Sequence, residues 1–243
     1  MKLKTNIKFI EAEIQRGKIL VWSKTPLKIL SSAVLNGGLQ DANGIMIVHV
    51  PEDCGSEIAD PVHSNPEDFL RKEASKLNLP QDKVVGLMTA ADLQNAELTS
   101  QKYEDTTLSA LVTAGISCPA TAGDEIASKY GSFRFKEFGT INIIVLIDGN
   151  LTESCMVNAV STVTEAKTVA LRELDIRSRF SGDLASGTVT DSVAVAHTKL
   201  GSPIKYAGTA TMIGELVGKS VKELVKKVIR KQQYLVPSRR ARP

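Results

Sequence analysis

Two long stretches with apolar residues at helical spacing constrain the fold of this chain more than any other feature. Between residues 152 and 175 apolar side chains recur every three or four positions, and the pattern returns from residue 212 to residue 228. A helix with one apolar stripe is stable only when that stripe is buried against another element. The two helices therefore predict a layered fold, in which some other part of the chain offers them an apolar face.

Several β-strands are expected to supply that face. Runs rich in β-branched residues alternate with turn residues, and the run from Thr140 to Ile147 is so apolar that we expect a strand buried on both faces. The other expected elements are strands at 7–14, 18–23, 27–35, 44–50, 84–89, 107–116 and 186–198, a helix at 66–79 and a loop at 51–65. The sequence predicts a single α+β domain over residues 1–235, with a mixed, largely antiparallel sheet flanked by two long helices.

Charge is distributed unevenly along the chain. Residues 219–243 hold nine basic residues and one acid, whereas the remainder holds 21 basic residues against 26 acids. A basic tail can bind nucleic acid. The charges also fit one solvated face of the last helix followed by a basic C-terminal tail at 236–243, and we favour that interpretation. Nucleic acid is therefore not an expected partner.

Composition and cysteine usage indicate the compartment. The chain is 42% hydrophobic and 23% charged, and its longest aliphatic run, 143–147, is far too short to span a bilayer. The three cysteines form no C-x-x-C pair, and the three histidines are not spaced as metal ligands. We expect a cytoplasmic protein that has no membrane partner, no disulfide framework and no metal site.

One lysine interrupts the apolar stripe of the first long helix. At about 100° per residue, Lys167 lies among Val160, Val163 and Ala170, whereas Glu165 lies on the polar side. A lysine in such a stripe either extends its amine to water at the rim or is buried beside an acid. The first alternative is the commoner one, and the second suits a catalytic role.

The segment 187–192 concentrates hydroxyl groups around one carboxylate. If it is a strand, Thr188, Thr190 and Ser192 share one face, and Asp191 points to the other. An acid on an apolar face needs a partner, and Lys167 is the first candidate. The alternative is a bulge or turn that leaves Asp191 in water.

Glycines mark two further places where backbone approaches closely. Asn36, Gly37 and Gly38 follow an expected strand, and their N–H groups can face a ligand, although a plain turn explains them as well. Small residues also occupy 114–123, but no phosphate-binding glycine motif is present in the sequence.

Seven segments in order resemble the adenosylcobinamide amidohydrolase family of corrinoid salvage. The resemblance extends from about residue 28 to residue 222, and the chain departs from it at Cys118-Pro119, where the family pattern has Asn-Ala. The matching segments are Ser31–Gly38, Val112–Ser117, Ala122–Asp124, Gly139–Asn142, Thr164–Lys167, Gly187–Ser192 with its Thr-Asp-Ser end, and Tyr206–Thr209 leading to Gly214–Leu216.

The resemblance implies hydrolysis of a linear, non-peptide amide, the one that joins aminopropanol to the propionyl arm of the corrin ring. The products are adenosylcobyric acid and aminopropanol, and the corrinoid itself is the substrate, so no cofactor is required. An amide hydrolase needs a nucleophile, a base and a stabiliser of the oxyanion. The expected catalytic residues are Glu165, Lys167, Asp191 and Ser192, and the expected substrate-binding residues are Asn36, Gly37, Gly38, Thr140, Asn142 and Thr190.

Their individual roles stay open at this point. Ser192 or Thr190 is the nucleophile, or Glu165 activates water, while Lys167 acts as base or stabiliser and Asp191 orients it. A second class of function is a corrinoid-binding or carrier protein without hydrolytic activity, which needs the glycine-rich cleft but not the charged residues. Product formation separates the two classes.

Overall fold

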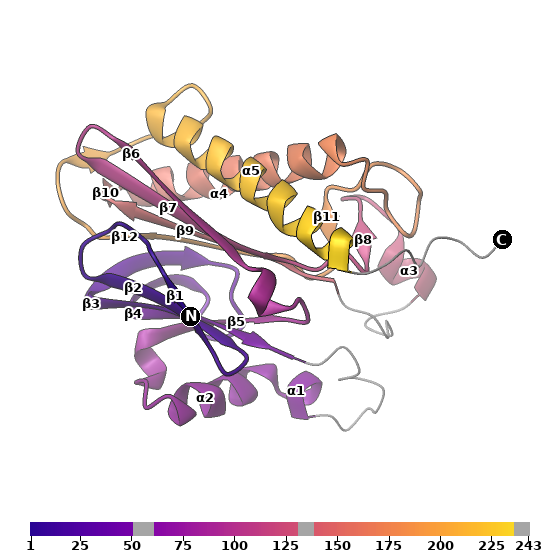
Figure 1. Cartoon of the computed structure of the whole chain (residues 1–243), viewed down its shortest axis with the longest axis horizontal. Coiled ribbons are helices and arrows are strands. Elements are labelled where there is room, and N and C mark those ends of the chain that lie inside the picture. The colour runs from indigo at the N-terminus through magenta and orange to yellow at the C-terminus, as the bar shows by residue number, and fades with distance from the viewer. Residues whose placement is uncertain (51–60, 131–138, 236–243) are drawn as a thin grey trace.

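The structure, a computed structural model, describes residues 1–50, 61–130 and 139–235. Its elements form four layers, with one helix layer below, two sheet layers in the middle and two long helices above (Figure 1). The two sheet layers belong to one nine-stranded sheet that folds over on itself. The expected α+β class and the two long helices are confirmed.

The long strand β3 (Lys18–Ser31) joins the two sheet layers. Its first half pairs with β2 (Ile10–Gln15), its second half pairs with β12 (Ser192–His197), and β4 (Gly38–His49) pairs along both halves. From β12 the sheet continues through β9 (Ile141–Asp148) and β7 (Thr106–Ala114) to β6 (Glu97–Tyr103), while β5 (Val84–Thr89) flanks β4 and β1 (Lys2–Leu3) flanks β2. Among the described residues of this nine-stranded sheet, the β4–β5 and β9–β12 pairs are parallel and the other pairs are antiparallel, so the expectation of a largely antiparallel sheet is confirmed.

An apolar core fills the space between the two sheet layers. Alternate residues of the strands face each other across it, such as Ile29 and Ile45 from one layer and Leu111 and Ile144 from the other. The remaining residues of β7 and β9 face the other way, toward the helices. Both faces of β9 are therefore buried, as its unbroken apolar sequence predicts.

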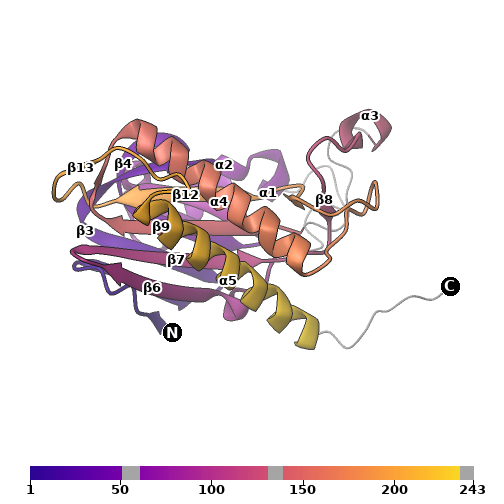
Figure 2. The ribbon, with the colours of Figure 1, turned by 90° about the horizontal axis from the view of Figure 1, so that it is seen from above.

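The two long helices lie side by side across the outer face of β7, β9 and β12 (Figure 2). Helix α4 (Glu153–Glu173) begins at Thr152, whose hydroxyl accepts the N–H of Cys155 as an N-cap. Helix α5 (Met212–Leu235) crosses it, and the two bury their apolar stripes together with the strands. Gly214 permits a close approach here, because a Cβ at this position would collide with the backbone of Gly208.

A shorter helix, α2 (Pro66–Lys76), covers the outer face of β4 and β5. It begins with an Asn65 cap and a proline in its first turn, as the sequence predicts. An almost buried ion pair fixes it to the sheet, with 2.7 Å between the Nζ of Lys18 and the Oε2 of Glu73. Pro61–Ser64 forms a short helix, α1, inside the expected loop at 51–65, and residues 51–60 of that loop lie outside the described residues.

The segment 97–103, for which the sequence pattern predicts no element, is the edge strand β6. One sequence-based expectation needs correction. The expected single strand at 186–198 is wrong, because it consists of β11 (Gly187–Thr188), a turn at 189–190 and β12. β11 pairs with β8 (Pro119–Ala120) and not with the main sheet. The other short elements are α3 (Ile126–Tyr130), β10 (Asn150–Leu151), β13 (Pro203–Ile204) and two single 3₁₀ turns at Gln81–Lys83 and Leu93–Asn95.

The basic residues of α5 are largely paired with acids. Lys226 contacts Glu173 of α4 at 2.8 Å and Glu223 of its own helix at 2.9 Å, and both acids raise the pKa of Lys226. Lys227 and Lys231 both contact Glu97 of β6. This arrangement agrees with a solvated helix face that docks on its neighbours. The basic tail at 236–243 lies outside the described residues.

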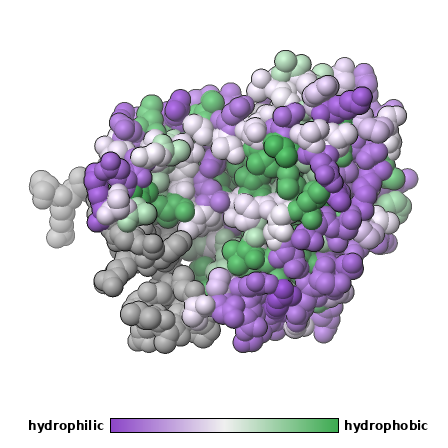
Figure 3. All heavy atoms as spheres, turned by 180° about the vertical axis from the view of Figure 1, so that it is seen from behind, coloured by the Kyte–Doolittle hydropathy of each residue, from purple (hydrophilic) through white to green (hydrophobic). Residues whose placement is uncertain are grey.

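Hydrophobic side chains gather near the middle of the face seen from behind, and hydrophilic side chains dominate its right-hand part (Figure 3). No helix within the described ranges is long and apolar enough to cross a membrane.

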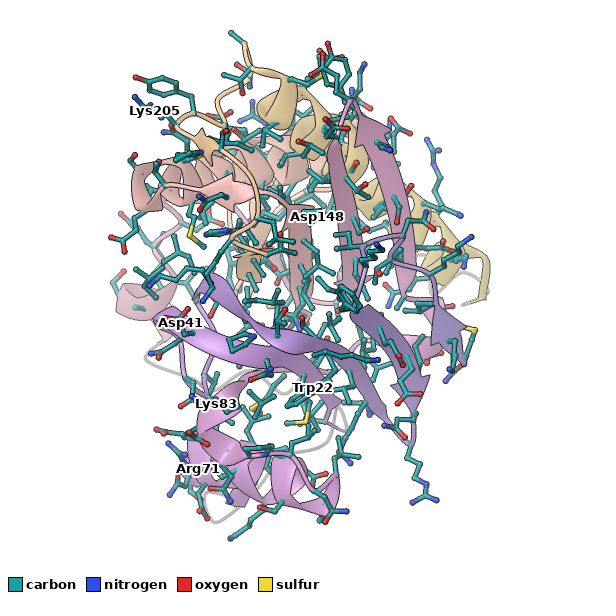
Figure 4. All side chains as sticks on the ribbon, turned by 90° about the vertical axis from the view of Figure 1, so that its left-hand side faces the viewer. Trp22, Asp41, Arg71, Lys83, Asp148 and Lys205 are labelled. Carbon is teal, nitrogen blue, oxygen red and sulfur yellow. The ribbon has the colours of Figure 1, made fainter. Side chains whose placement is uncertain are left out.

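The end that carries Asp41 and Asp148 (Figure 4) is opposite to the end where β8, β11 and α3 lie in Figure 1.

Candidate active site

The structure brings Lys167 and Asp191 together at the end of the sandwich that carries β8 and β11. The Nζ of Lys167 lies 2.5 Å from the Oδ2 of Asp191, and the two side chains are only 9% and 11% exposed. Lys167 is therefore buried and paired, and it does not extend to water at the rim. A buried lysine–carboxylate pair of this kind is costly to break, because either partner alone becomes an uncompensated charge.

Asp191 holds together three segments that are far apart in the sequence. Besides Lys167 on α4, its carboxylate accepts the backbone N–H of Ile141 at the start of β9, at 2.9 Å. It also accepts the backbone N–H of Thr188 at 3.0 Å and lies within hydrogen-bond distance of the Thr188 hydroxyl. Three N–H donors thus surround this carboxylate, together with the Thr188 hydroxyl, whose single proton is shared with the Gly139 carbonyl. These contacts fix the turn between β11 and β12.

The same turn directs two hydroxyl groups at one backbone carbonyl. The oxygen of Gly139 lies 2.7 Å from the Oγ1 of Thr188 and 3.0 Å from the Oγ1 of Thr190. The Oγ1 of Thr190 is also 2.6 Å from the Oγ1 of Thr140. A continuous set of contacts therefore runs from the Lys167–Asp191 pair to Thr140. The expectation that Thr188 points away from Asp191 is wrong, because β11 ends at Thr188 and the turn at 189–190 interrupts the strand alternation.

Gly187 leaves room for the ion pair. A Cβ at this position would collide with the Oδ2 of Asp191 and would lie 2.7 Å from the Nζ of Lys167. Glycine is required here for space and not for backbone strain, since its φ is not in the left-handed region. This requirement explains why a glycine precedes the hydroxyl-rich segment.

Asn142 and Ser192 face the space between the two sheet layers. They are register partners on the parallel strands β9 and β12, and Asn142 is completely buried whereas Ser192 is half-buried. The amide nitrogen of Asn142 donates to the carbonyl of Met88 on β5, at 2.9 Å. The two residues therefore lie at the same end of the molecule as Asp191 but on the inter-sheet face.

The turn at Asn36 has a structural explanation. The amide nitrogen of Asn36 donates to the carbonyls of Gln81 and Val84, both at 2.7 Å, and so attaches the turn to the beginning of β5. A Cβ on Gly37 would collide with the carbonyl of Ala33, and Gly38 has a φ of +81°. Among the described residues, no hydrogen bond joins this turn to the Lys167–Asp191 pair, so its substrate contacts stay a prediction.

Glu165 lies apart from the pair. Its side chain is exposed on the outer side of α4, whereas Lys167 is buried on the inner side, as the helical spacing predicts. The contacts of Asp191 come instead from Lys167, the partner expected from the sequence, from Thr188, and from the backbone N–H of Ile141, which the sequence did not single out. The carbonyl of Gly139 joins the network through the hydroxyls of Thr188 and Thr190.

Other reactive side chains offer no alternative centre in the part of the chain described here. Burial raises the pKa of the Cys155 thiol to about 11, so it is not a thiolate at neutral pH. Across residues 1–50, 61–130 and 139–235, no three histidine, cysteine or acidic side chains gather as they would around a metal ion.

The end of this α+β sandwich carries a lysine–carboxylate pair, several hydroxyls and a backbone carbonyl that two of these hydroxyls contact. Such a set of groups defines a candidate hydrolytic enzyme. Comparison with known proteins specifies the class. The chain matches the adenosylcobinamide amidohydrolase family over residues 2–237, and it belongs to that family of enzymes.

Individual relatives agree with the family. The chain is 31% identical over 199 residues to the adenosylcobinamide amidohydrolase of Methanosarcina mazei, covering 78% of this chain and 84% of that protein. It is 33% identical over 190 residues to an uncharacterized protein of Methanocaldococcus jannaschii, covering 72% and 74%. Among solved structures, the PH0078 protein from Pyrococcus horikoshii OT3 is similar with a TM-score of 0.43 and 12% identity, covering 92% of this chain and 78% of that one. That score is too low to establish a shared fold.

Proposed function

We propose that this protein hydrolyses the amide between aminopropanol and the propionyl arm of the corrin ring in adenosylcobinamide, and that it releases adenosylcobyric acid. The family and the relative from Methanosarcina mazei support this substrate. The observation that carries the proposal is the Lys167–Asp191 pair with the hydroxyls of Thr188, Thr190 and Thr140 connected to it. Amide hydrolysis by an enzyme of this class requires an activated nucleophile in a fixed geometry.

Thr190 is the hydroxyl that the geometry favours as nucleophile. Its side chain is half-buried, so substrate can reach it, and its Oγ1 contacts both Thr140 and the Gly139 carbonyl. Ser192 is the second candidate, because it is half-buried as well and follows Asp191 directly. It has the weaker claim, since no hydrogen bond from its hydroxyl to the Asp191 network is found in the described residues.

The scheme balances as an ordinary acyl transfer. The Oγ1 of Thr190 bonds to the amide carbon, the C–N bond breaks, and aminopropanol leaves as the amine with the proton that the hydroxyl gave up. Water then cleaves the resulting ester, which restores the hydroxyl and yields the carboxylic acid. Lys167 acts as a positioning residue, because it holds Asp191, and Asp191 holds the turn that carries Thr190.

No cofactor enters this scheme, and the corrinoid is the only small-molecule partner that it needs. We place the reaction in the cytoplasm, as expected from the cysteine usage. A decisive test is incubation of purified protein with adenosylcobinamide, followed by chromatography for adenosylcobyric acid and aminopropanol. Turnover that disappears in Thr190→Val supports the scheme. Tight binding of the corrinoid without any product would instead identify a carrier protein.

A further inference from the structure

Two buried polar atoms at the candidate site have no hydrogen-bond partner among the described residues. They are the Oγ1 of Thr113 on β7 and the Oδ1 of Asn142 on β9, and both residues are completely inaccessible to solvent. Buried polar groups in native proteins are nearly always paired, because an unpaired one costs roughly 1–3 kcal/mol. Two such atoms in neighbouring residues therefore need an explanation.

The two residues belong to one row across the sheet. Thr113 is the register partner of Asn142, and Asn142 is the register partner of Ser192 on β12. Residues directly opposite each other on paired strands have their side chains on the same face, so the three side chains form a polar row that faces the inter-sheet space. The next row inward, Leu111, Ile144 and Ala194, is apolar and belongs to the core.

Exposure falls along this row from β12 to β7. Ser192 is half-buried, whereas Asn142 and Thr113 are fully enclosed, so the row leads from the Ser192 end toward the interior. One step nearer the end of the sheet, Thr140 precedes Asn142 by two positions and therefore shares its face. Thr140 contacts Thr190 at 2.6 Å. The unpaired atoms thus lie one row behind the hydroxyls of the proposed catalytic centre.

The orientation of Asn142 determines what it can bind. Its amide nitrogen donates to the Met88 carbonyl, and this bond assigns the remaining atom, Oδ1, as an acceptor. The hydroxyl of Thr113 can donate as well as accept. Side by side they present one acceptor and one donor, which is the complement of a carboxamide, whose N–H donates and whose carbonyl accepts.

We propose that Thr113 and Asn142 form a carboxamide-binding pair, which takes one amide of the corrinoid and so fixes the substrate against the Thr190 hydroxyl. The assignment rests on the proposed function, because it takes the corrinoid as the ligand. Asn142 was expected at the site from the sequence, but the role of Thr113 comes from the structure alone. The cost of two unpaired buried atoms in the free protein is offset when the substrate pairs them.

Thr113→Val tests the pair, since valine keeps the shape of threonine and removes the hydroxyl. A matched control is Thr162→Val on α4, because the hydroxyl of Thr162 is buried and donates to the Ala207 carbonyl at 2.8 Å. The readouts are the thermal midpoint without ligand, the affinity for adenosylcobinamide from the ligand-induced rise of that midpoint, and the kcat and KM of turnover.

Removal of an unpaired hydroxyl should leave the midpoint of Thr113→Val unchanged or higher, while corrinoid affinity falls about 10-fold or more. Thr162→Val should show the opposite pattern, with a lower midpoint and wild-type affinity. Wild-type affinity in Thr113→Val overturns the proposal. A lower midpoint with wild-type affinity also overturns it, since the hydroxyl then pairs with Asn142 or with a buried water in the free protein.

Two further measurements keep the test decisive. If Thr113→Val does not fold, Thr113→Ser and Thr113→Ala replace it, and the proposal requires that the serine variant, which keeps the hydroxyl, binds at least about 10-fold more tightly than the alanine variant. If wild-type protein binds the corrinoid but forms no product, the proposed hydrolysis fails while the affinity comparison still tests the amide pair. If wild-type protein neither binds nor hydrolyses adenosylcobinamide, both proposals fail.

Discussion

The Nζ of Lys167 on helix α4 lies 2.5 Å from the Oδ2 of Asp191, which follows the turn between β11 and β12. The two residues are 24 positions apart in the sequence. The absence of a side chain on Gly187 leaves the space for this contact. Through the remaining donors of Asp191, the pair also fixes the beginning of β9 and the threonines of the turn. In the proposed scheme, stability and chemistry depend on the same few atoms, so variants must be designed to separate the two effects.

Lys167→Met removes the charge and keeps an unbranched side chain of similar length. We expect turnover to fall by roughly 100-fold or more, the loss that a displacement of about 1 Å at a reacting group can cause. Because the proposed role is positioning, kcat should fall while KM stays near the wild-type value. Stability should also fall, since an unpaired buried carboxylate costs roughly 3–5 kcal/mol. Steady-state kinetics well below the melting temperature of the variant measure the first effect.

The control for that variant is Lys199→Met. Lys199 contacts Asp41 at 2.6 Å, but the pair is exposed and far from the site. Surface pairs contribute at most about 1 kcal/mol, so both stability and turnover should stay close to wild type. A Lys167→Met protein that hydrolyses adenosylcobinamide at the wild-type rate would contradict the role of the pair.

Gly187→Ala should disturb the pair without removing either charge. The new methyl group needs the space that Asp191 and Lys167 occupy, and overpacking of this kind typically costs about 1–3 kcal/mol. Gly218→Ala is the matched change, because a Cβ at that position in α5 meets nothing within 4 Å. Alanine should there stabilise the helix by up to about 1 kcal/mol. The melting temperatures of both variants, compared with that of the wild type, measure these two effects. Equal changes in the melting temperatures of Gly187→Ala and Gly218→Ala would show that the site tolerates the methyl group.

Thr190→Val and Ser192→Ala distinguish the two candidate nucleophiles. Loss of a nucleophilic hydroxyl removes the covalent route, so we expect turnover of Thr190→Val to fall below detection and that of Ser192→Ala to fall by no more than about 10-fold. Product formation under saturating adenosylcobinamide gives the answer. The reverse order of activities would assign the attack to Ser192.

His197 predicts a dependence of stability on pH. Burial lowers the pKa of this imidazole, and its Nδ1 accepts the backbone N–H of Leu151 and of Lys199. The histidine of the unfolded chain has a pKa near 6.5. As the pH falls below that value, the unfolded chain therefore binds a proton at this residue more readily than the folded protein does. This contribution to stability is fully present above about pH 6.5 and is lost as the pH falls below that value.

His197→Gln should flatten that part of the stability curve, because glutamine does not titrate. Chemical denaturation between about pH 7.5 and pH 5 measures the slope for both proteins. Identical slopes in wild type and variant would show that other groups cause the dependence.

Deletion of residues 237–243 should leave turnover within a few-fold of wild type. These residues are basic and proline-containing, and they follow the last apolar position of the helical pattern, so they add nothing to the proposed centre. Kinetics of the shortened protein test this expectation. A loss of 100-fold or more in folded protein would assign the tail a part in the reaction.

The sequence by itself determined the elements whose patterns are long and regular. The helical spacing of α4 and α5 and the apolar run of β9 express local geometry, since every third or fourth residue of a helix must face the same side. The same spacing correctly placed Lys167 inward and Glu165 outward. The strand β6 was not recognised, because its half-buried polar residues carry little alternation.

Only the tertiary structure decided how the segment 186–198 is divided and what its hydroxyls contact. A strand and a turn of this composition look alike in the sequence, and the turn forms because Asp191 accepts bonds from Lys167 and Ile141, which lie far away along the chain. The unpaired atoms of Thr113 and Asn142 likewise became visible only once strand register placed them side by side. Local sequence patterns report which face of an element is buried, whereas contacts between distant segments depend on register and packing that no local pattern records.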